Sequence, residues 1–371
     1  MVELSHDQRV SWLRLIRSEN VGPATFRSLI NHFGSAEAAL DALPAMARRG
    51  GAHSGISIPS RADAEREMDT TARFGARIVA IGEPLYPLYL KEIAAPPPLI
   101  ALQGGSVELV SRATVAIVGS RNASIAGQKM AERIGRGLAD TGVVVVSGLA
   151  RGIDAAAHRA SLTGGTIAVV AGGIDHVYPE EHRGLIDEIV AAGGAILTEM
   201  PFGWAPRAKD FPRRNRIVSG MSLGVVVVEA AARSGTLHTA RFALDQGREV
   251  FAVPGSPLDP RAEGTNRLIR DGATLVTSAA DVLSVLGPQM HRDISSRGHV
   301  EEPAGDEELP DAIDMEARNL VISSLGPTPV AVDDIILHTG LKSKVVSIIL
   351  LELDLAGRLE RHGNQLVSLI D

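Results

Sequence analysis

The most constraining feature of this chain is the run Thr114–Arg121, TVAIVGSR. A short, apolar, β-branched run that ends on Gly-Ser-Arg is typical of a buried parallel strand that enters a phosphate-facing turn. A dinucleotide-binding turn would continue as G-x-G-x-x-G, but here Ser120 and Arg121 follow Gly119, and the next glycine is Gly127. The turn therefore presents a guanidinium where bare backbone normally wraps a pyrophosphate. This predicts a Rossmann-like scaffold whose ligand is not NAD.

The composition indicates a folded, soluble protein with room for two or three domains. The chain has 371 residues, of which 45% are hydrophobic, and it has no cysteine. The lack of cysteine excludes disulfides and thiolate metal sites. No run approaches the roughly 18 consecutive apolar residues of a membrane span, and the N-terminal residues lack the apolar core of a signal peptide. We therefore expect a cytoplasmic protein with no membrane segment.

The net charge of −7 is concentrated in one segment and does not argue against nucleic acid as a partner. Residues 291–316 contain nine acidic and two basic residues, a difference that equals the charge of the whole chain. The other residues are therefore neutral on average and can still carry a basic patch.

Residues 1–75 are predicted to form a small helical domain. Apolar residues repeat with helical spacing on both sides of Asn20–Ala24, a helix stop followed by a helix restart. This pattern resembles a helix-hairpin-helix or SAM-like bundle. Some such hairpins bind DNA phosphates through backbone amides, but a bundle used for packing or partner contacts has the same pattern. The residues do not decide between the two.

Residues 76–287 are predicted to form an extended Rossmann-like domain with a doubly wound parallel sheet. Strand-like runs recur along it, and helical patterns such as 126–139 and 185–192 lie between many of them. Strands that alternate with helices favour a parallel sheet, whose ligands lie at the carboxyl ends of the strands. The predicted strands are 77–81, 114–118, 143–147, 166–170, 195–198, 224–229, 249–253 and 274–276.

The C-terminal part is predicted to be an acidic linker, 288–311, followed by a winged-helix domain, 312–371. The linker is polar enough to remain disordered. After it, three helical patterns precede a hairpin signal around Gly363-Asn364. Three helices followed by a hairpin is the order of a winged helix, and the helices are expected at 315–325, 331–339 and 342–356.

Two predicted loops place single cations at the carboxyl ends of strands. The first is Gly119–Arg121. The second, Ser147–Asp154, contains two glycines that allow close backbone approach, the cation Arg151 and the acid Asp154. Asp154 caps a helix, orients an arginine, or pairs with Arg151 to hold the loop. We favour the pairing, and we keep Arg151 with Gly119, Ser120 and Arg121 among the candidate nucleic-acid-binding residues.

The run Arg207–Arg216 is the strongest candidate for a nucleic-acid contact. It carries five cations against one anion, with Trp204 beside it and Phe211 inside it, in a chain with only 3% aromatic residues. Cations that follow phosphates and rings that stack on bases are the two components of a single-strand groove. The candidate residues of this run are Lys209, Phe211, Arg213, Arg214, Asn215 and Arg216.

Ser234, Gly235 and Thr236 form a candidate phosphate pocket. They follow an apolar strand and open a predicted helix, where hydroxyls and free amides bind anions. An ordinary helix N-cap uses the same residue types, so the pattern fits both. The sequence contains no catalytic set, no Walker loop and no close spacing of metal ligands. We expect no enzyme activity, no cofactor and no metal.

Together these segments resemble the DprA/Smf family of bacterial DNA-processing proteins. Seven motifs occur in one order and span most of residues 85–285, which makes the resemblance specific. The motifs are VAIVGSR (115–121), SGLARGID (147–154), GGTIAVVAGGID-x-x-YP (164–179), ILTEMPFG (196–203), FPRRNRIVSGMS (211–222), VVVEAAARSGTLHTA (226–240) and GREVFAVPG (247–255).

The resemblance implies a single-stranded DNA-binding protein of DNA processing, recombination and natural transformation (competence). It implies that the Rossmann-like domain binds the strand, protects incoming DNA, loads the RecA recombinase and self-associates as a homodimer. The family's DNA contacts, in the GSR turn and the F-P-x-R-N segment, correspond here to Arg121, Lys209, Phe211, Arg213 and Arg214. Which of Arg213 and Arg214 contacts phosphate stays open, because Arg214 and Asn215 also fit an internal support.

Two other functions are compatible with parts of the sequence. Nucleoside-monophosphate phosphoribohydrolases share a nucleotide-binding Rossmann scaffold and carry P-G-G-x-G-T-x-x-E. The corresponding stretch has Thr239 where the catalytic glutamate is needed, and a hydroxyl cannot replace a carboxylate at neutral pH. A winged-helix transcription regulator would use 342–356 as its recognition helix, but this segment lacks the Arg, Asn and Gln residues expected for base reading. We interpret the winged helix as a regulatory or protein-contact module.

Overall fold

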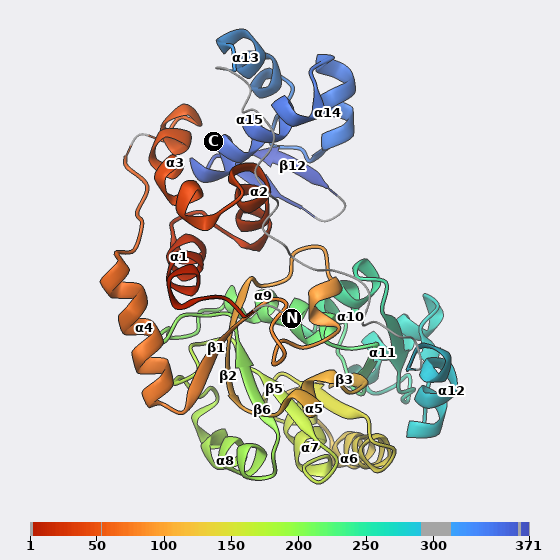
Figure 1. Ribbon diagram of the computed structural model, residues 1–371. Helices are drawn as coiled ribbons and strands as arrows, with labels where there is room; N and C mark the ends of the chain where they lie inside the picture. Colours follow the sequence, from red (N-terminus) through yellow and green to blue (C-terminus); the bar gives the residue numbers. More distant parts are fainter. Residues whose placement is uncertain (1–2, 53, 291–312, 363–364, 371) are drawn as a thin grey trace. The chain divides into compact units, whose positions relative to one another are not determined.

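The computed structural model divides into two compact units (Figure 1). The first comprises residues 1–3 and 66–299, and the second comprises residues 4–65 and 300–371. The second unit therefore joins the N-terminal and C-terminal parts of the sequence. The residues that the structure describes are 3–52, 54–290, 313–362 and 365–370.

A nine-stranded sheet forms the middle of the first unit, in the order β1-β2-β6-β5-β4-β3-β7-β8-β9. Each of the eight predicted strands is present with its ends within two residues of the expected ones, which confirms the doubly wound Rossmann-like fold. The strands are β1 (Ala76–Ala80), β2 (Leu99–Gly104), β3 (Thr114–Val118), β4 (Val144–Ser147), β5 (Thr166–Val169), β6 (Ala195–Thr198), β7 (Gly224–Val227), β8 (Glu249–Ala252) and β9 (Thr274–Leu275).

The sheet is parallel from β6 to β9, but its other edge is antiparallel. β2 pairs antiparallel with both β1 and β6, and Leu102 lies opposite Leu197. This antiparallel edge departs from the expected parallel sheet, and β2 was not predicted. The segment between β1 and β2 contains only the 3-10 turn Leu90–Glu92 and no crossover helix, so the two strands can run in opposite directions.

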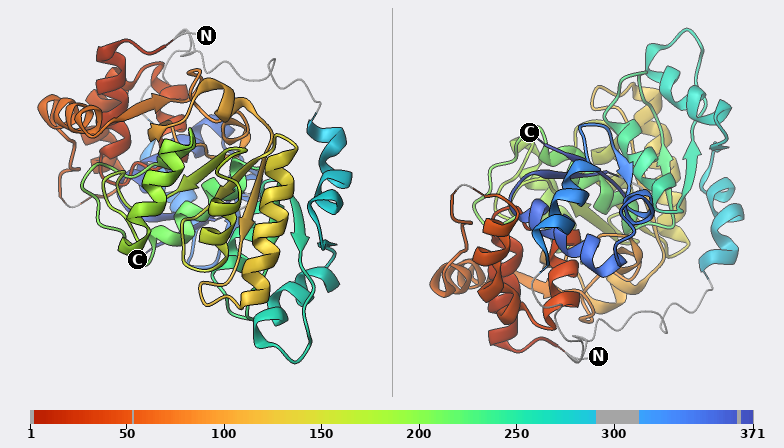
Figure 2. Two further views of the ribbon diagram at one scale, coloured as in Figure 1. Left: turned by 90° about the horizontal axis from the view of Figure 1, so that it is seen from below. Right: turned by 90° about the horizontal axis from the view of Figure 1, so that it is seen from above.

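Helices cover both faces of this sheet. Alternate residues of β3 point to the two faces: Val115 and Ile117 pack with α6, α7 and α12, whereas Ala116 and Val118 pack with α9 and α10. Figure 2 shows α6 and α12 lying side by side. The helices of this unit are α5 (Val107–Ser111), α6 (Ile125–Asp140), α7 (Ile153–Ala160), α8 (Arg183–Ala191), α9 (Asp210–Gly220), α10 (Thr236–Asp245), α11 (Glu263–Arg270) and α12 (Ala279–Met290).

The N-terminal part of the second unit is the predicted helical bundle. The helix stop and restart are confirmed, because α1 ends at Arg17 and α2 begins at Pro23. The rings of Trp12 and Phe26 meet edge to face at 5.1 Å in its core. The helices are α1 (His6–Arg17), α2 (Pro23–Phe33), α3 (Ala36–Arg49) and α4 (Arg61–Arg73), and α4 continues into the first unit.

The C-terminal part of the second unit is the predicted winged helix. A short strand, β10, adds to the expected helices and hairpin and completes a sheet of order β10-β12-β11. Gly363-Asn364 and most of the acidic linker lie outside the described residues, whereas residues 288–290 belong to α12. The elements are α13 (Met315–Ser323), β10 (Val330–Ala331), α14 (Val332–Thr339), α15 (Ser343–Leu355), β11 (Leu359–Arg361) and β12 (Leu366–Leu369).

The helices of the described ranges are too short or too polar to cross a membrane. None of the helices there combines the length and the apolar character that a bilayer crossing requires.

Candidate nucleic-acid interface

The candidate site lies where the order of the strands reverses. From β3 the chain continues through β4, β5 and β6 on one side, and through β7, β8 and β9 on the other. β3 and β7 are parallel neighbours, with Val118 opposite Val227, so their carboxyl ends open at the same edge. Ligands of doubly wound sheets bind at this switch point. The loops after β3, β4 and β7 line one pocket there.

The Gly119–Arg121 turn is fixed by the two helices beside it. A Cβ on Gly119 would lie 2.5 Å from a side-chain carbon of Ile153, so only glycine fits between β3 and α7. The carbonyl oxygen of Ser120 accepts the Ile153 N–H at 3.3 Å, and that of Gly119 accepts the Thr236 hydroxyl at 3.0 Å. The turn is therefore held through its backbone, and the Arg121 side chain remains exposed.

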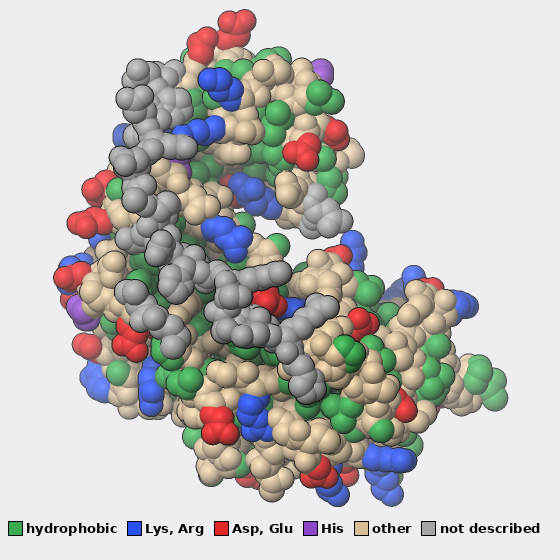
Figure 3. All heavy atoms as spheres, turned by 45° about the vertical axis from the view of Figure 1, so that its right-hand side comes forward, with side chains coloured by type: hydrophobic (Ala, Val, Ile, Leu, Met, Phe, Trp, Pro, Cys, Tyr) green, Lys and Arg blue, Asp and Glu red, His purple; other side chains and the backbone are tan. Residues whose placement is uncertain are grey.

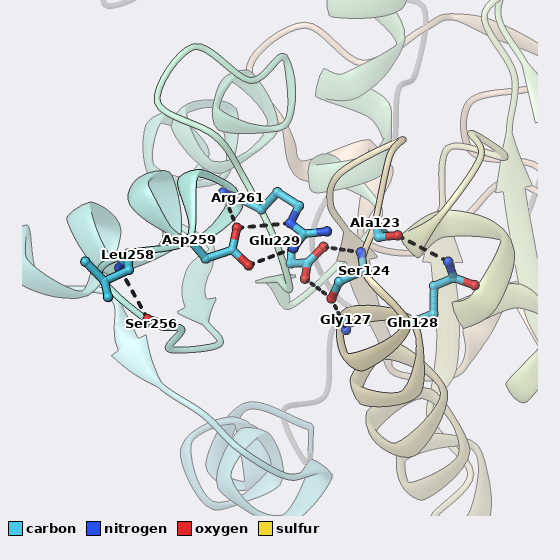
Figure 4. A network of polar contacts seen from close by, with 9 residues as sticks. All are labelled: Ala123, Ser124, Gly127, Gln128, Glu229, Ser256, Leu258, Asp259 and Arg261. Carbon is cyan, nitrogen blue, oxygen red and sulfur yellow. Dashed lines mark hydrogen bonds and ion pairs between the residues drawn. The ribbon is translucent and has the colours of Figure 1, made fainter.

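Glu229, just beyond β7, anchors the far end of the same turn (Figure 4). Its carboxylate accepts the Ser124 N–H at 2.9 Å and the Ser124 hydroxyl at 2.5 Å. Ser124 is the N-cap of α6 and accepts the Gly127 N–H at 2.9 Å. The helix N-terminus that receives a pyrophosphate in dinucleotide-binding folds is thus occupied by a carboxylate of the chain itself.

An arginine and two aromatic rings form a stack above the turn. The Arg121 guanidinium carbon lies 5.2 Å from the centre of the Phe211 ring, a cation–π contact. Tyr178 meets the same ring edge to face at 5.3 Å and is 52% exposed. Tyr178 was not among the predicted site residues, because its HVYP segment has the pattern of an ordinary turn. An aromatic residue in a loop of an aromatic-poor chain is the signal that could have identified it.

The pocket beside this stack has a volume of about 610 Å³. It brings together the predicted Gly119–Arg121 turn, the start of α9 and the predicted phosphate pocket at the start of α10. Its lining residues are Val118, Gly119, Ser120, Arg121, Asn122, Gly148, Ala150, Asp154, Phe211, Pro212, Arg214, Asn215, Val218, Ala231, Arg233, Ser234, Gly235, Thr236, His238 and Thr239.

Arg214 forms the inner wall of this pocket and is only 6% exposed. Its Nη1 donates to the carbonyl oxygens of Gly148 and Val169, and its Nε donates to Asn215 Oδ1 at 3.3 Å. Burial lowers the pKa of Arg214 to about 10, so the guanidinium remains charged at neutral pH. The structure therefore gives Arg214 and Asn215 the internal supporting position that the sequence left open.

Asp154 lies behind the same loop and does not pair with Arg151. Its Oδ2 accepts the N–H groups of Gly148 and Ala150 at 3.1 and 3.2 Å. Burial raises the pKa of this carboxyl, while the nearby Arg214 guanidinium acts in the opposite direction. Arg151 instead makes a two-pronged ion pair with Glu181, with both contacts at 2.6 Å. The expected Arg151–Asp154 pair is wrong, because Asp154 is drawn inward by the backbone amides and Arg151 is exposed.

The cations of the Arg207–Arg216 run have unequal surroundings. Glu199, which is 7% exposed, forms ion pairs with both Arg213 and Arg216. Lys209 precedes α9 and is exposed, and no partner for its ammonium is found among the described residues. Of the predicted cations, Arg121, Arg207 and Lys209 are exposed and form no ion pair with an acid within the described part of the chain.

Trp204 holds the loop before α9 together. Its indole N–H donates to Asp210 Oδ2 at 2.9 Å, and the same oxygen accepts the Arg207 N–H at 2.8 Å. The Arg207 guanidinium carbon lies 4.4 Å from the centre of the Trp204 ring. The ring and the carboxylate thereby fix the start of α9, which carries Phe211 into the stack.

Ser234, Gly235 and Thr236 join the start of α10 to the Gly119 turn. The Ser234 hydroxyl accepts the Thr236 N–H at 3.2 Å. No side chain of the described residues caps the N-cap position, Gly235. The first amides of α10 already have partners, because the N–H groups of Leu237 and His238 donate to the carbonyl oxygens of Ser234 and Gly235 at 3.1 and 3.2 Å. These residues line the pocket, but their bonds are those of an ordinary helix start.

Charges elsewhere do not gather into one field on the face drawn in Figure 3, where Lys and Arg side chains lie among Asp and Glu side chains. Within the described residues, no cluster of His, Asp and Glu side chains could hold a metal ion. The exposed cations at the site are Arg121 and Arg233, which line the pocket, and Arg207 and Lys209, which lie just before α9.

Three family models match successive parts of the chain. "DNA recombination-mediator protein A" matches residues 77–287, "DprA-like N-terminal HHH domain" matches residues 6–70, and "DprA winged helix domain" matches residues 305–365. A DNA processing protein DprA of Bacillus subtilis is 42% identical over 214 residues, which cover 57% of this chain and 72% of the relative. A putative DprA of Mycobacterium tuberculosis H37Rv is 35% identical over 375 residues, which cover 94% of this chain and 92% of the relative.

Two solved structures are similar to the fold. The X-ray structure of DprA from Streptococcus pneumoniae has a TM-score of 0.62 and 33% identity, and the match covers 76% of this chain and 98% of that one. A structure of DprA from Helicobacter pylori, described as having a unique single-stranded DNA binding mode, has a TM-score of 0.52 and 27% identity. The match covers 58% of this chain and 97% of that one.

The fold and the site define a Rossmann-like protein with flanking helix-hairpin-helix and winged-helix parts. Within that class, the chain belongs to the DNA recombination-mediator protein A (DprA) family, the family that its motif order resembles.

Proposed function

We propose that this protein binds single-stranded DNA at the rim of the pocket beside Arg121. The main support for this proposal is the stack of Arg121 on Phe211, with the exposed Tyr178 at its edge. Exposed rings stack on unpaired bases without reading sequence, and an adjacent cation attracts the phosphates between them. A duplex hides the faces of its bases and would not use the rings.

The occupied N-terminus of α6 supports a polymer as ligand over a dinucleotide. A pyrophosphate placed there would meet the Glu229 carboxylate, which already accepts the Ser124 N–H and hydroxyl. The exposed cations Arg121 and Lys209 remain for phosphates. These groups belong to separate elements, as a chain of phosphates requires.

A phosphoribohydrolase activity has little support at this site. Thr239, at the position of that family's glutamate, is 2% exposed. The acid among the pocket-lining residues is Asp154, which is bonded to two backbone amides and lies near Arg214. A carboxylate held in this way is not positioned to exchange protons with a sugar. Release of ribose 5-phosphate from AMP by the purified protein would overturn this argument.

The wider role that we propose follows from family membership. We propose that the protein protects incoming DNA and loads the RecA recombinase in natural transformation, in the cytoplasm. We also propose a homodimer through the Rossmann-like domain. Support for the dimer comes from three exposed leucines: Leu244 on α10, Leu258 after β8, and Leu275 on the edge strand β9. Sedimentation at increasing concentration would test the dimer, and RecA strand exchange would test the loading.

Fluorescence anisotropy with labelled oligonucleotides tests the binding proposal. We expect a thymine or mixed-sequence single strand to bind at least about tenfold tighter than a duplex of the same length, a difference of about 1.4 kcal/mol. Equal affinities for the two would contradict it. Protection of one duplex sequence in the presence of competitor DNA would favour a winged-helix regulator instead.

A further inference from the structure

The third helix of the winged helix, α15, is buried on two faces. Its first face, Val346, Ile349, Leu350 and Leu353, packs in the core of the winged helix. A second stripe, spaced like one helix face, is also buried and does not belong to that core. It consists of Ile348 (7% exposed), Leu351 (2%), Glu352 (1%) and Leu355 (1%). This second face is the one that a recognition helix presents to the major groove of DNA.

The N-terminal helices of the same chain cover this second face. α15 packs against both α2 and α3. A Cβ on Gly50, just after α3, would lie 1.9 Å from the backbone oxygen of Glu352, so the two backbones touch and only glycine fits. The amide of Asn20 donates to the Leu355 carbonyl oxygen at 3.1 Å. The covering segment therefore includes the hairpin between α1 and α2.

The polar contacts across this interface centre on two acids of α15. Glu352 accepts from Arg49 at 2.5 Å and from Arg318 at 3.0 Å, so one guanidinium comes from each side. The Thr25 hydroxyl donates to Asp354 at 2.8 Å. Burying a carboxylate is costly unless it is paired and hydrogen-bonded, and the Arg49 contact exists only while the N-terminal helices are in place.

We infer that α15 is a protein-docking helix whose partner is the chain's own N-terminal helical segment, and that duplex DNA does not use it. Three apolar side chains and one acid form the stripe, and none of them suits phosphates or base edges. The same contacts occupy the hairpin at Asn20 and Thr25, the part of a helix-hairpin-helix that would meet a phosphate backbone. Both nominal DNA-binding elements are thus used to join the two ends of the chain.

An engineered disulfide in the full-length chain tests the inference directly. The chain has no cysteine, so Thr25→Cys with Asp354→Cys creates a single pair at a place where the native side chains touch at 2.8 Å. We expect an intramolecular cross-link in the monomer, and duplex and single-strand affinities that change by less than about twofold. Failure to cross-link with both an oxidant and a short bismaleimide reagent, or cross-linking only between copies, overturns the inference. So does loss of duplex binding on oxidation, because α15 would then need to open.

A wedge variant tests the same interface in the opposite direction. Gly50→Val places a side chain against the Glu352 backbone, whereas Gly55→Val enters open space and is the matched control. In Gly50→Val we expect faster amide hydrogen exchange in both α3 and the second half of α15, with duplex affinity unchanged. A gain in duplex affinity of about tenfold or more would show a masked DNA reader and would overturn the inference. Exchange that rises in α3 alone would also overturn it.

Discussion

Replacing Arg214 by methionine should destabilise the Rossmann-like unit severely. The guanidinium is 6% exposed, holds the carbonyl oxygens of Gly148 and Val169, and lies near the buried Asp154 carboxylate. Arg214→Met keeps much of the side-chain volume, but it leaves the two carbonyl oxygens and the Asp154 carboxylate without their cation. Removing one partner of a buried charge pair costs about 3–5 kcal/mol. For a domain of this size, that cost lowers the melting temperature by roughly 6–20 °C.

Thermal unfolding followed by circular dichroism measures this effect, with Arg213→Met as the matched control. Arg213 has a 46% exposed side chain, and its partner Glu199 retains Arg216, so we expect a loss of at most about 1 kcal/mol. Adding Asp154→Asn to Arg214→Met should recover part of the loss, because the uncompensated charge is then removed. If Arg214→Met melts no lower than Arg213→Met, the loop-supporting role of Arg214 is refuted.

Other predictions concern a buried histidine, the anchor of the turn and the edge of the stack. Burial, with His182 and Arg214 nearby, lowers the pKa of His158 to about 3, below its unfolded value near 6.5. The free energy of unfolding should therefore fall as the pH falls from 6.5 towards 3, by up to about 1.4 kcal/mol per pH unit. Urea titrations at several pH values should show that His158→Gln lacks this part of the pH dependence. Glu229→Ala should speed amide hydrogen exchange in residues 119–127. Glu229→Gln should largely preserve protection, because the side-chain amide oxygen can still accept from Ser124. Equal exchange in the two variants would contradict the role of Glu229 in holding the turn. Tyr178→Ala should weaken single-strand binding by about 1–3 kcal/mol and Tyr178→Phe should not, as anisotropy would show.

The strands and the turn at Gly119 were predictable because their signals are local. Five successive buried residues in β3 require apolar side chains on both faces of the sheet, and that leaves a continuous run in the sequence. The winged helix was predictable for the same reason, since α15 must repeat its apolar residues with helical spacing. In contrast, β2 was missed because its run lies between short turns without a helical pattern beside it.

The roles of individual charges were not predictable, because they depend on residues far away in the sequence. Arg214 is buried because Gly148, 66 positions away, leaves room for its guanidinium. Arg213 and Arg214 are neighbours in the sequence, yet one pairs with Glu199 at the surface and the other supports a loop. In the same way, the second buried stripe of α15 is apolar in the sequence, but nothing there indicates that α2 and α3 cover it.

We propose that phosphates of a single strand contact the exposed cations beside the Gly119 turn. The most direct measurement is the salt dependence of single-strand affinity for the wild type, Arg121→Ala and the control Lys129→Ala, whose exposed side chain lies on α6 outside the pocket. We predict that Arg121→Ala binds more weakly and that its log–log slope is shallower by about 0.7, the value for one phosphate contact on a single strand. The control should match the wild type. Equal slopes and affinities for Arg121→Ala and the wild type would contradict the account.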